Sequence, residues 1–335
     1  MTHARADVRL GFARNALNLP QLELVSASSD ASFRSYWRTV GATPERIVMD
    51  APPNREDLGP WLDVAERLQR AGLNAPRVLA QDLDSGLLLI SDLGNALLMP
   101  ALNPASVEHN YAEAMRAVLT MQTAIDASDL PAYDETRLVT EMELLPTWFL
   151  QRHLGLDVAC EQWDVIELAF RTLVSNAHAQ PQRFVHRDFH SRNLMLTERG
   201  LSIIDFQDAV RGPITYDLVS LLRDCYIEWP RSQVEAWVEA YRQQAVKANL
   251  TAADRAHFLR WFDLMGLQRH IKVLGIFCRL WYRDGKAGYL GDLPMVWRYT
   301  RDVGRRYPEI TPLIELIENA IGQRDITQPQ SNQAS

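Results

Sequence analysis

The sequence has few cysteines, no surplus of positive charge and no long apolar run, and each shortage excludes a class of protein. Three widely spaced cysteines, Cys160, Cys225 and Cys278, predict buried free thiols rather than a disulfide framework or a cysteine metal site. Because 42 acidic residues outnumber 35 basic ones and give a net charge of -7, the chain lacks the basic footprint of a nucleic-acid-binding protein. No apolar run reaches the roughly 18 residues that span a bilayer, and the start has no signal-peptide pattern. We therefore expect a cytoplasmic protein that binds neither nucleic acid nor membranes.

The 335 residues suffice for two lobes. The polar segment Ser91–Gly94 suits a hinge. Before it, the sequence predicts two helices and several short strands. The strand-like runs are 22–27, 33–40, 47–49, 77–80 and 87–90. Beyond the hinge, apolar residues recur every three to four positions, which predicts helices. We expect a two-lobed α+β fold, with a small antiparallel-sheet lobe over 1–94, a larger mostly helical lobe over 95–326 and a disordered tail over 327–335.

Two details of the helical part can be tested separately. Pro146 should break a helix that the apolar spacing predicts over 137–153. A long helix should run from 252 to about 283, with Thr251 as its N-cap.

The polar groups concentrate in one stretch, Phe184–Asp208, which reads FVHRDFHSRNLMLTERGLSIIDFQD. Asp188 is followed five residues later by Asn193, and Asp205 comes directly after the apolar run 201–204. Residues 194–196 and 201–204 flank a Glu-Arg-Gly turn and predict a hairpin that would hold Asn193 and Asp205 at the ends of paired strands. A base followed by two metal ligands at this spacing indicates a phosphoryl-transfer site.

Phosphoryl transfer needs a positioned hydroxyl, Mg²⁺ and donors around a nucleotide. Asp188 would accept the proton of the attacking hydroxyl, and Asn193 and Asp205 offer the hard oxygens that Mg²⁺ prefers. His190 completes the pattern H-x-D-x-H-x-x-N and is expected to be a hydrogen-bonded structural residue. The alternative, a polar turn and a solvated strand end, is disfavoured because four residue types at fixed offsets form a specific motif. We expect ATP and Mg²⁺ as cofactors.

The runs HRDFHSRN, IIDFQD and GPITYDLVSLL resemble the aminoglycoside phosphotransferase and choline kinase group of protein-kinase-like folds. The resemblance covers about 22–222 and implies a kinase fold that binds ATP between its lobes. It implies that Asp188 is the catalytic base, that Asn193 and Asp205 bind Mg²⁺, and that the backbone of 91–93 meets adenine. By the same resemblance Asp217 braces the catalytic loop. His186 and His190 are expected to give this loop structural support.

Within this group, the runs DASFRSYWR, VMDAPP, LLLISDLG and LQRHIKVLGIFCRLWYRDGK resemble bacterial kinases that phosphorylate N-acetylmuramate and N-acetylglucosamine. In those kinases the acceptor is the anomeric hydroxyl, and the reaction serves peptidoglycan recycling. The resemblance therefore implies a small-molecule amino sugar as the acceptor.

Lysine is the scarcest charged residue, and its distribution departs from the kinase pattern. The only lysines are Lys247, Lys272 and Lys286, whereas kinases of this fold place a lysine on the third strand to hold the α- and β-phosphates. Met49 stands at the expected position. An arginine must then supply any cationic clamp.

The candidates for this clamp lie near the first turn. Arg34 and Arg38 share one face of a strand over 33–40 by two-residue periodicity, and our hypothesis is that one of them replaces the lysine. The alternative is a solvated charged face. The sequence also lacks a glycine-rich phosphate loop, so Ser28 and Ser29 of the serine-rich turn are expected to hold phosphate through hydroxyl and backbone groups. The cofactor-binding set is thus Ser28, Ser29, Arg34, Arg38, Ser91, Asp92 and Leu93.

The acceptor side carries a basic surplus. Only twelve positions separate Asp205 from Asp217, too few for an activation segment, so a small-molecule acceptor is favoured over a protein. Residues 255–306 contain 11 basic and 4 acidic residues, which suits an anion such as a lactyl carboxylate better than a polycation. Candidate contacts, each with the alternative that it faces solvent, are Arg269, Lys272 and Arg283.

Three questions stay open from the sequence. Four aromatic residues at helical spacing, Trp261, Phe262, Trp281 and Tyr282, could stack on a sugar, although such residues are more often core. An antibiotic-modifying kinase would share every catalytic residue, and a pseudokinase is disfavoured because a binding module does not need the base. The oligomeric state is not predicted.

Overall fold

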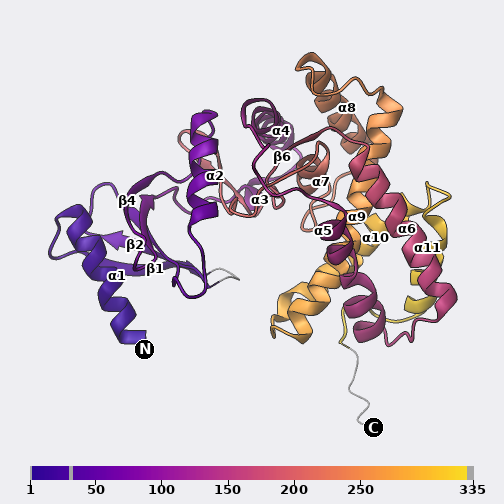
Figure 1. Ribbon diagram of the computed structural model, residues 1–335, viewed down its shortest axis with the longest axis horizontal. Coiled ribbons are helices and arrows are strands. Elements are labelled where there is room, and N and C mark those ends of the chain that lie inside the picture. The colour runs from indigo at the N-terminus through magenta and orange to yellow at the C-terminus, as the bar shows by residue number, and fades with distance from the viewer. Residues whose placement is uncertain (1, 30–32, 330–335) are drawn as a thin grey trace, which may run out of the picture. The chain divides into compact units, whose positions relative to one another are not determined.

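The computed structural model describes residues 2–29 and 33–329, and their contacts divide the chain into two compact units (Figure 1). The first unit comprises residues 1–110 and 191–209, and the second comprises 111–190 and 210–335. This division differs from the expected single boundary after Gly94. The difference arises because the hairpin at 194–203 bonds to earlier segments, with Ser202 bridged to Asn74 and Met195 bridged to Leu97. Most of the expected tail, 330–335, lies outside the described residues.

The first unit is built on a five-stranded antiparallel sheet of order β1-β2-β3-β5-β4. Its strands are β1 (Glu23–Ser29), β2 (Ser35–Val40), β3 (Arg46–Asp50), β4 (Val78–Asp82) and β5 (Leu87–Ser91), which confirms the predicted antiparallel sheet. Its helices are α1 (Thr2–Leu17), α2 (Gly59–Arg70) and α3 (Leu98–Ala101). α1 packs on the sheet through Ala13, which joins Val48, Leu87 and Leu89 in a buried cluster.

The hairpin predicted inside the polar stretch is confirmed. β7 (Leu194–Thr197) pairs antiparallel with β8 (Gly200–Ile203), and Gly200 adopts the positive φ of 92° that the tight turn requires. Beyond the strands, the Ile204 N–H donates to the Asn193 carbonyl at 3.1 Å. The hairpin therefore holds Asn193 and Asp205 next to each other at its open end.

The second unit is helical and is organised around the long helix α9 (Arg255–Tyr282). The helices in contact with it include α5 (Glu135–Met142), the π-helix η1 (Leu145–His153), α6 (Cys160–His178), α7 (Tyr216–Leu222), α8 (Arg231–Lys247), the 3₁₀ helix η2 (Ala287–Asp292) and α10 (Leu293–Gly304). The unit also contains most of α4 (Val107–Ala124), α11 (Thr311–Ile321) and the two-stranded sheet of β6 (Gln182–Val185) and β9 (Val210–Pro213). Gly275 permits the close packing of α9 on the start of η1, because an added Cβ would lie 2.3 Å from the Leu144 backbone.

Two details of the sequence analysis are corrected. The N-cap of α9 is Asp254, whose carboxylate accepts the His257 N–H at 2.8 Å; Thr251 instead accepts the Ala253 N–H. Cys160 is exposed because it is the first residue of α6, whereas Cys225 and Cys278 are buried as expected. The break at Pro146 is confirmed, since α5 ends at Met142 and η1 begins at Leu145.

Among the helices that the structure describes, none is long and apolar enough to cross a membrane.

Candidate active site

The loop that carries the predicted base is held by Asp217. This buried side chain of α7 accepts the backbone N–H groups of His186 at 2.7 Å and Arg187 at 3.1 Å. Arg187 has a φ of 77°, which costs a non-glycine residue free energy and persists only when surrounding contacts fix it. Burial raises the pKa of Asp217 to about 7, although both N–H bonds act to lower it. The position of Asp217 is thus that of the expected loop brace.

Glu141 on α5 also holds Arg187, and the sequence analysis missed it. The Glu141 carboxylate accepts from the Arg187 guanidinium and the Tyr133 hydroxyl, and it pairs with Lys272 Nζ at 3.1 Å. Burial acts to raise the pKa of Glu141, but the charges of Lys272 and Arg187 outweigh it and keep this pKa below its ordinary value. Because these residues come from separate elements, no local pattern could have indicated the cluster.

The electrostatic environment keeps Asp188 ionised. Burial acts to raise its pKa, but the charges of Lys272, His190, Arg269 and Arg187 overcome this and hold the pKa of Asp188 below its ordinary value. A base must be deprotonated to accept a proton, so this environment favours the role expected for it.

The two histidines of the motif occupy structural positions. The Asp188 N–H donates to His186 Nδ1 at 3.2 Å, and His186 is fully buried. The His190 ring lies edge-on to Tyr226, with centroids 5.7 Å apart. Both side chains therefore support the loop around Asp188, as a structural role requires.

The three candidate acceptor contacts have different environments. Arg269 and Lys272 are buried in α9, and their charges act on Asp188. Arg269 Nη1 lies 3.3 Å from Cys225 Sγ. Arg283, in contrast, is exposed at the end of α9 and pairs with the neighbouring Asp284. Only Arg269 and Lys272 are thus placed near the base.

A row of aromatic rings that the sequence analysis did not single out extends from His190. Centroid distances are 6.3 Å between Tyr226 and Phe277 and 5.3 Å between Phe277 and Tyr289, and both tyrosines are half-buried. The rings come from three segments, so no spacing pattern indicates them. Among the four aromatic residues considered from the sequence, Trp261 and Phe262 are core residues, and Tyr282 contacts His153.

In the first unit, the predicted metal ligands meet at the hairpin end. Asn193 Nδ2 lies 3.3 Å from Asp205 Oδ2, and Asp205 has a positive φ of 62°. Gln207, which the sequence analysis missed, donates to Asp205 Oδ1 at 3.1 Å, while its own Oε1 is buried without a hydrogen-bond partner among the described residues. An amide, a carboxylate and an unsatisfied amide oxygen are hard donors, so the residues fit Mg²⁺.

Arg34 provides a cation at this position. Its side chain is 7% exposed, and Nη2 lies 3.3 Å from Asp205 Oδ1. Met49, at the place expected for a kinase lysine, is fully buried in β3. The chain therefore puts an arginine beside a predicted metal ligand and an apolar side chain where the lysine was expected.

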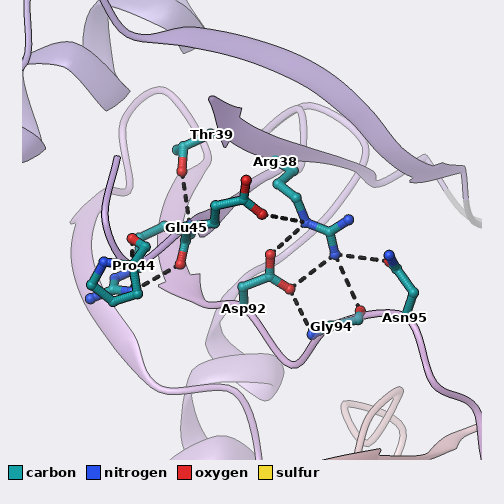
Figure 2. Close-up of polar contacts among 8 residues, drawn as sticks. Arg38, Thr39, Pro44, Glu45, Asp92, Gly94 and Asn95 are labelled. Atoms are coloured by element: carbon teal, nitrogen blue, oxygen red, sulfur yellow. Dashed lines mark hydrogen bonds and ion pairs between the residues drawn. The ribbon is translucent and has the colours of Figure 1, made fainter. Parts of the chain in front are cut away.

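Arg38 bonds to the hinge segment and the residue after it, not to the predicted metal ligands (Figure 2). Its Nε lies 2.5 Å from Asp92 Oδ2, and its Nη2 lies 3.0 Å from Asp92 Oδ1, 3.2 Å from the Gly94 carbonyl and 2.9 Å from Asn95 Oδ1. The hydrogen bond that Arg38 donates to Asp92 raises the pKa of Arg38, against the effect of burial. Arg38 thus ties β2 to the hinge segment, and Arg34 is the stronger candidate for the clamp.

A cavity of about 450 Å³ lies in the first unit between the hinge segment and the two predicted metal ligands; Arg34 is not among its lining residues. Its apolar lining includes Ile47 and Ile90, and its remaining lining includes Tyr36, Arg38, Ser91, Asp92, Leu93, Asn193 and Asp205. Ser28 and Ser29 pair in register with Tyr36 and Ser35; residues 30–32 of the serine-rich turn lie outside the described residues. An apolar cavity with a polar end and a hinge backbone suits a purine nucleotide.

The comparisons with known proteins identify the family. A family model described as "Phosphotransferase enzyme family" matches residues 23–257. The chain belongs to the phosphotransferase enzyme family. A relative from Pseudomonas aeruginosa named "N-acetylmuramate/N-acetylglucosamine kinase" is 44% identical over 300 residues, with 89% of each chain covered. A relative of the same name from Neisseria meningitidis is 39% identical over 310 residues, covering 91% of this chain and 92% of its own.

Solved structures of two other kinases show the same fold at low identity. An ethanolamine kinase of Plasmodium vivax has a TM-score of 0.63 at 10% identity, with 88% of this chain and 87% of its own covered. A choline kinase of Cryptosporidium parvum has a TM-score of 0.61 at 12% identity, covering 92% of this chain and 98% of its own. The predicted α+β, protein-kinase-like fold class is confirmed.

Proposed function

We propose that this phosphotransferase is a cytoplasmic, ATP-dependent sugar kinase that transfers the γ-phosphate of ATP to the anomeric hydroxyl of N-acetylmuramate and N-acetylglucosamine, in peptidoglycan recycling. The observation that carries the proposal is the ionised Asp188, on a loop braced by Asp217 and surrounded by buried cations. The names of the relatives support the choice of sugar.

Asp188 accepts the proton of the attacking sugar hydroxyl as the sugar oxygen bonds to the γ-phosphorus and the bond from that phosphorus to the leaving ADP breaks. Asn193 and Asp205 would hold Mg²⁺, which would neutralise phosphate oxygens, and Gln207 orients Asp205 by donating to its carboxylate. Arg34, held beside Asp205, acts as the cationic clamp on the nucleotide phosphates. The backbone of residues 91–93 receives adenine, and Ser28 and Ser29 contact phosphate.

The acceptor side favours a neutral or anionic sugar. Arg269 and Lys272 are buried near Asp188, and burying a polycationic substrate against them would be electrostatically costly. Arg269 is our candidate for the lactyl carboxylate, because Lys272 is already paired with Glu141. The half-buried rings of Tyr226 and Tyr289 offer an apolar surface to the sugar face.

The test is incubation with ATP, Mg²⁺ and a panel of sugars and aminoglycosides, with phosphorus NMR to locate the phosphate on the product. We expect an anomeric phosphate on both amino sugars, lost with Asp188→Asn and kept with Asp284→Asn, which changes an exposed carboxylate at the end of α9. A 6-phosphate product, or turnover of kanamycin without turnover of N-acetylhexosamines, would overturn the proposal.

A further inference from the structure

A second cavity, of about 440 Å³, lies in the helical unit, where the end of α7, the start of α8 and the helix α10 meet. Its charged lining residues are Arg223, Glu228, Arg231, Asp302 and Arg306, and its other lining residues are Trp229, Pro230, Tyr299 and Val303. None of these residues has a part in the phosphoryl transfer proposed above.

Arg223 is the unusual member of this lining. Its side chain is 7% exposed, its Nε has no hydrogen-bond partner, and no ion pair involves it within residues 2–29 and 33–329. The guanidinium lies over the Tyr299 ring, 4.8 Å from the centroid. Burial and the neighbouring charge of Arg231 lower the pKa of Arg223, although Tyr299 and the charge of Asp263 act to raise it. A buried cation without an ion pair of its own is costly, and a bound anion would reduce that cost.

The other charges of the cavity leave a positive excess. Arg231 is neutralised by Asp263 at 2.5 Å and by Glu235 at 2.5 Å. The two acidic lining residues have partners of their own, Arg298 for Glu228 at 2.7 Å and Arg301 for Asp302 at 3.1 Å. Arg306 is exposed and has no ion pair among the described residues. Two arginines at one cavity thus lack a carboxylate partner.

The backbone adds to this positive potential. α8 is 17 residues long and begins at Arg231, which lines the cavity, so the positive end of the helix dipole lies at the cavity. Oxyanions are the ligands that such helix starts favour. The helix start alone would not define a site, but it coincides here with a buried, uncompensated arginine.

We propose that this cavity binds the phosphate group of a small phosphate ester. Arg223 and Arg306 have no ion pair of their own among the described residues, and planar guanidinium donors bind tetrahedral oxyanions through paired hydrogen bonds. A volume of about 440 Å³ exceeds that of a single ion and leaves room for an organic group against Trp229 and Tyr299. A phosphate ester offers three acceptor oxygens to these donors, whereas a carboxylate offers two.

The experiment uses the full chain with inorganic phosphate as the probe, followed by calorimetry and thermal unfolding, with sulfate and acetate as comparison anions. We expect phosphate and sulfate to bind, and Arg306→Ala to weaken phosphate binding at least fivefold. The matched control Arg305→Ala removes an exposed arginine at the end of α10 whose partner, Glu318, does not line the cavity, and it should keep wild-type affinity. Acetate binding as strongly as phosphate would overturn the assignment to a phosphate group.

Arg223→Met gives an independent readout. In phosphate-free buffer this variant should unfold at or above the wild-type temperature, because it loses an uncompensated buried charge, and phosphate should no longer raise its Tm. A lower Tm of the variant in phosphate-free buffer would contradict the claim that the Arg223 charge lacks an ion pair in the folded protein. Phosphate binding that falls with Arg34→Ala but survives Arg306→Ala would place the ion in the first unit's cavity and overturn the proposal.

Discussion

At the scale of single residues, the candidate site depends on cations that are held in place before substrate arrives. Lys272 is buried, bonds to the Tyr216 hydroxyl at 3.2 Å and pairs with Glu141. Its charge is the largest influence that lowers the pKa of Asp188. The only buried lysine among the described residues therefore serves the base rather than the nucleotide.

The first prediction concerns the pH dependence of Lys272→Met. Asp188 acts as a base only when deprotonated, and its lowered pKa keeps it deprotonated into acidic solution. Removing the Lys272 charge raises the pKa of Asp188, while His190, Arg269 and Arg187 still act on it. The acidic limb of kcat/KM against pH should therefore move to higher pH. Lys247→Met, a change of an exposed helical lysine, is the control, and an unmoved limb in Lys272→Met would contradict the prediction.

The second prediction separates the two arginines near the nucleotide cavity. Arg34→Ala removes the cation beside Asp205 and should lower kcat/KM for ATP by about 10²-fold, the effect of losing one preorganised donor to a phosphoryl group. Arg38→Ala breaks contacts to Asp92 and the hinge, so it should chiefly lower Tm. Steady-state kinetics and thermal unfolding measure the two effects, with the exposed Arg55→Ala as control. Equal kinetic losses in both variants would show that the roles are not divided in this way.

At the scale of elements, the catalytic loop is fixed from two sides. α7 binds its backbone through Asp217, and α5 binds its Arg187 side chain through Glu141. In protein kinases, phosphorylation of an activation segment orders the site. The stretch between Asp205 and Asp217 is too short for such a segment. Instead, the Glu141 carboxylate is a permanent negative partner of Arg187.

Glu141→Gln should therefore lower kcat by about tenfold or more while the KM for ATP stays near the wild-type value. The amide keeps the size of the side chain but cannot neutralise Arg187 and Lys272, so the positive-φ conformation at Arg187 is less well fixed. Glu143→Gln, an exposed change just beyond α5, is the matched control. If Tm falls and kcat per folded molecule does not, Glu141 has only a structural role.

α1 is the second element whose attachment can be tested. Asp50 of β3 is buried and accepts Arg9 Nη1 at 2.7 Å and Arg5 Nη2 at 2.5 Å, both from α1. Arg9 also lies over the Trp37 ring, 3.7 Å from its centroid. The ion pairs thus tie a helix that precedes the family-matched residues to the central strands of the sheet.

Asp50→Asn should lower the free energy of unfolding by about 3 kcal/mol, because removing one partner leaves the buried Arg9 charge uncompensated. Chemical denaturation measures this change. Asp7→Asn removes an exposed carboxylate of α1 and should change the unfolding free energy by less than about 0.5 kcal/mol. Similar small losses in both variants would mean that the ion pairs do not hold α1.

At the scale of the whole molecule, the sequence predicted what lies close along the chain. The base and metal ligands fall within one stretch of alternating apolar and polar residues, and the change from strand to helix periodicity follows the hinge. Contacts between distant positions could not be predicted, such as Arg38 with Asp92, 54 residues apart, or Arg187 with Glu141, 46 apart. The absence of an ion pair at Arg223 among the described residues could not be predicted either, because a sequence does not show which charges stay unpaired after folding.

The division into two units leads to the last prediction. Lys272 shares Glu141 with Arg187 in the second unit, whereas Arg38 bonds to residues of the first unit. Among the described residues, Arg38 and Lys272 have no hydrogen-bond or ion-pair partner in common. A double-mutant cycle on kcat/KM should give a coupling of about 1 kcal/mol or more for Glu141→Gln with Lys272→Met, since members of one network do not act additively. Arg38→Ala with Lys272→Met should couple by less than about 0.5 kcal/mol. A larger coupling across the units would mean that the nucleotide side and the base side act as one network, and it would contradict the separate organisation of their side chains.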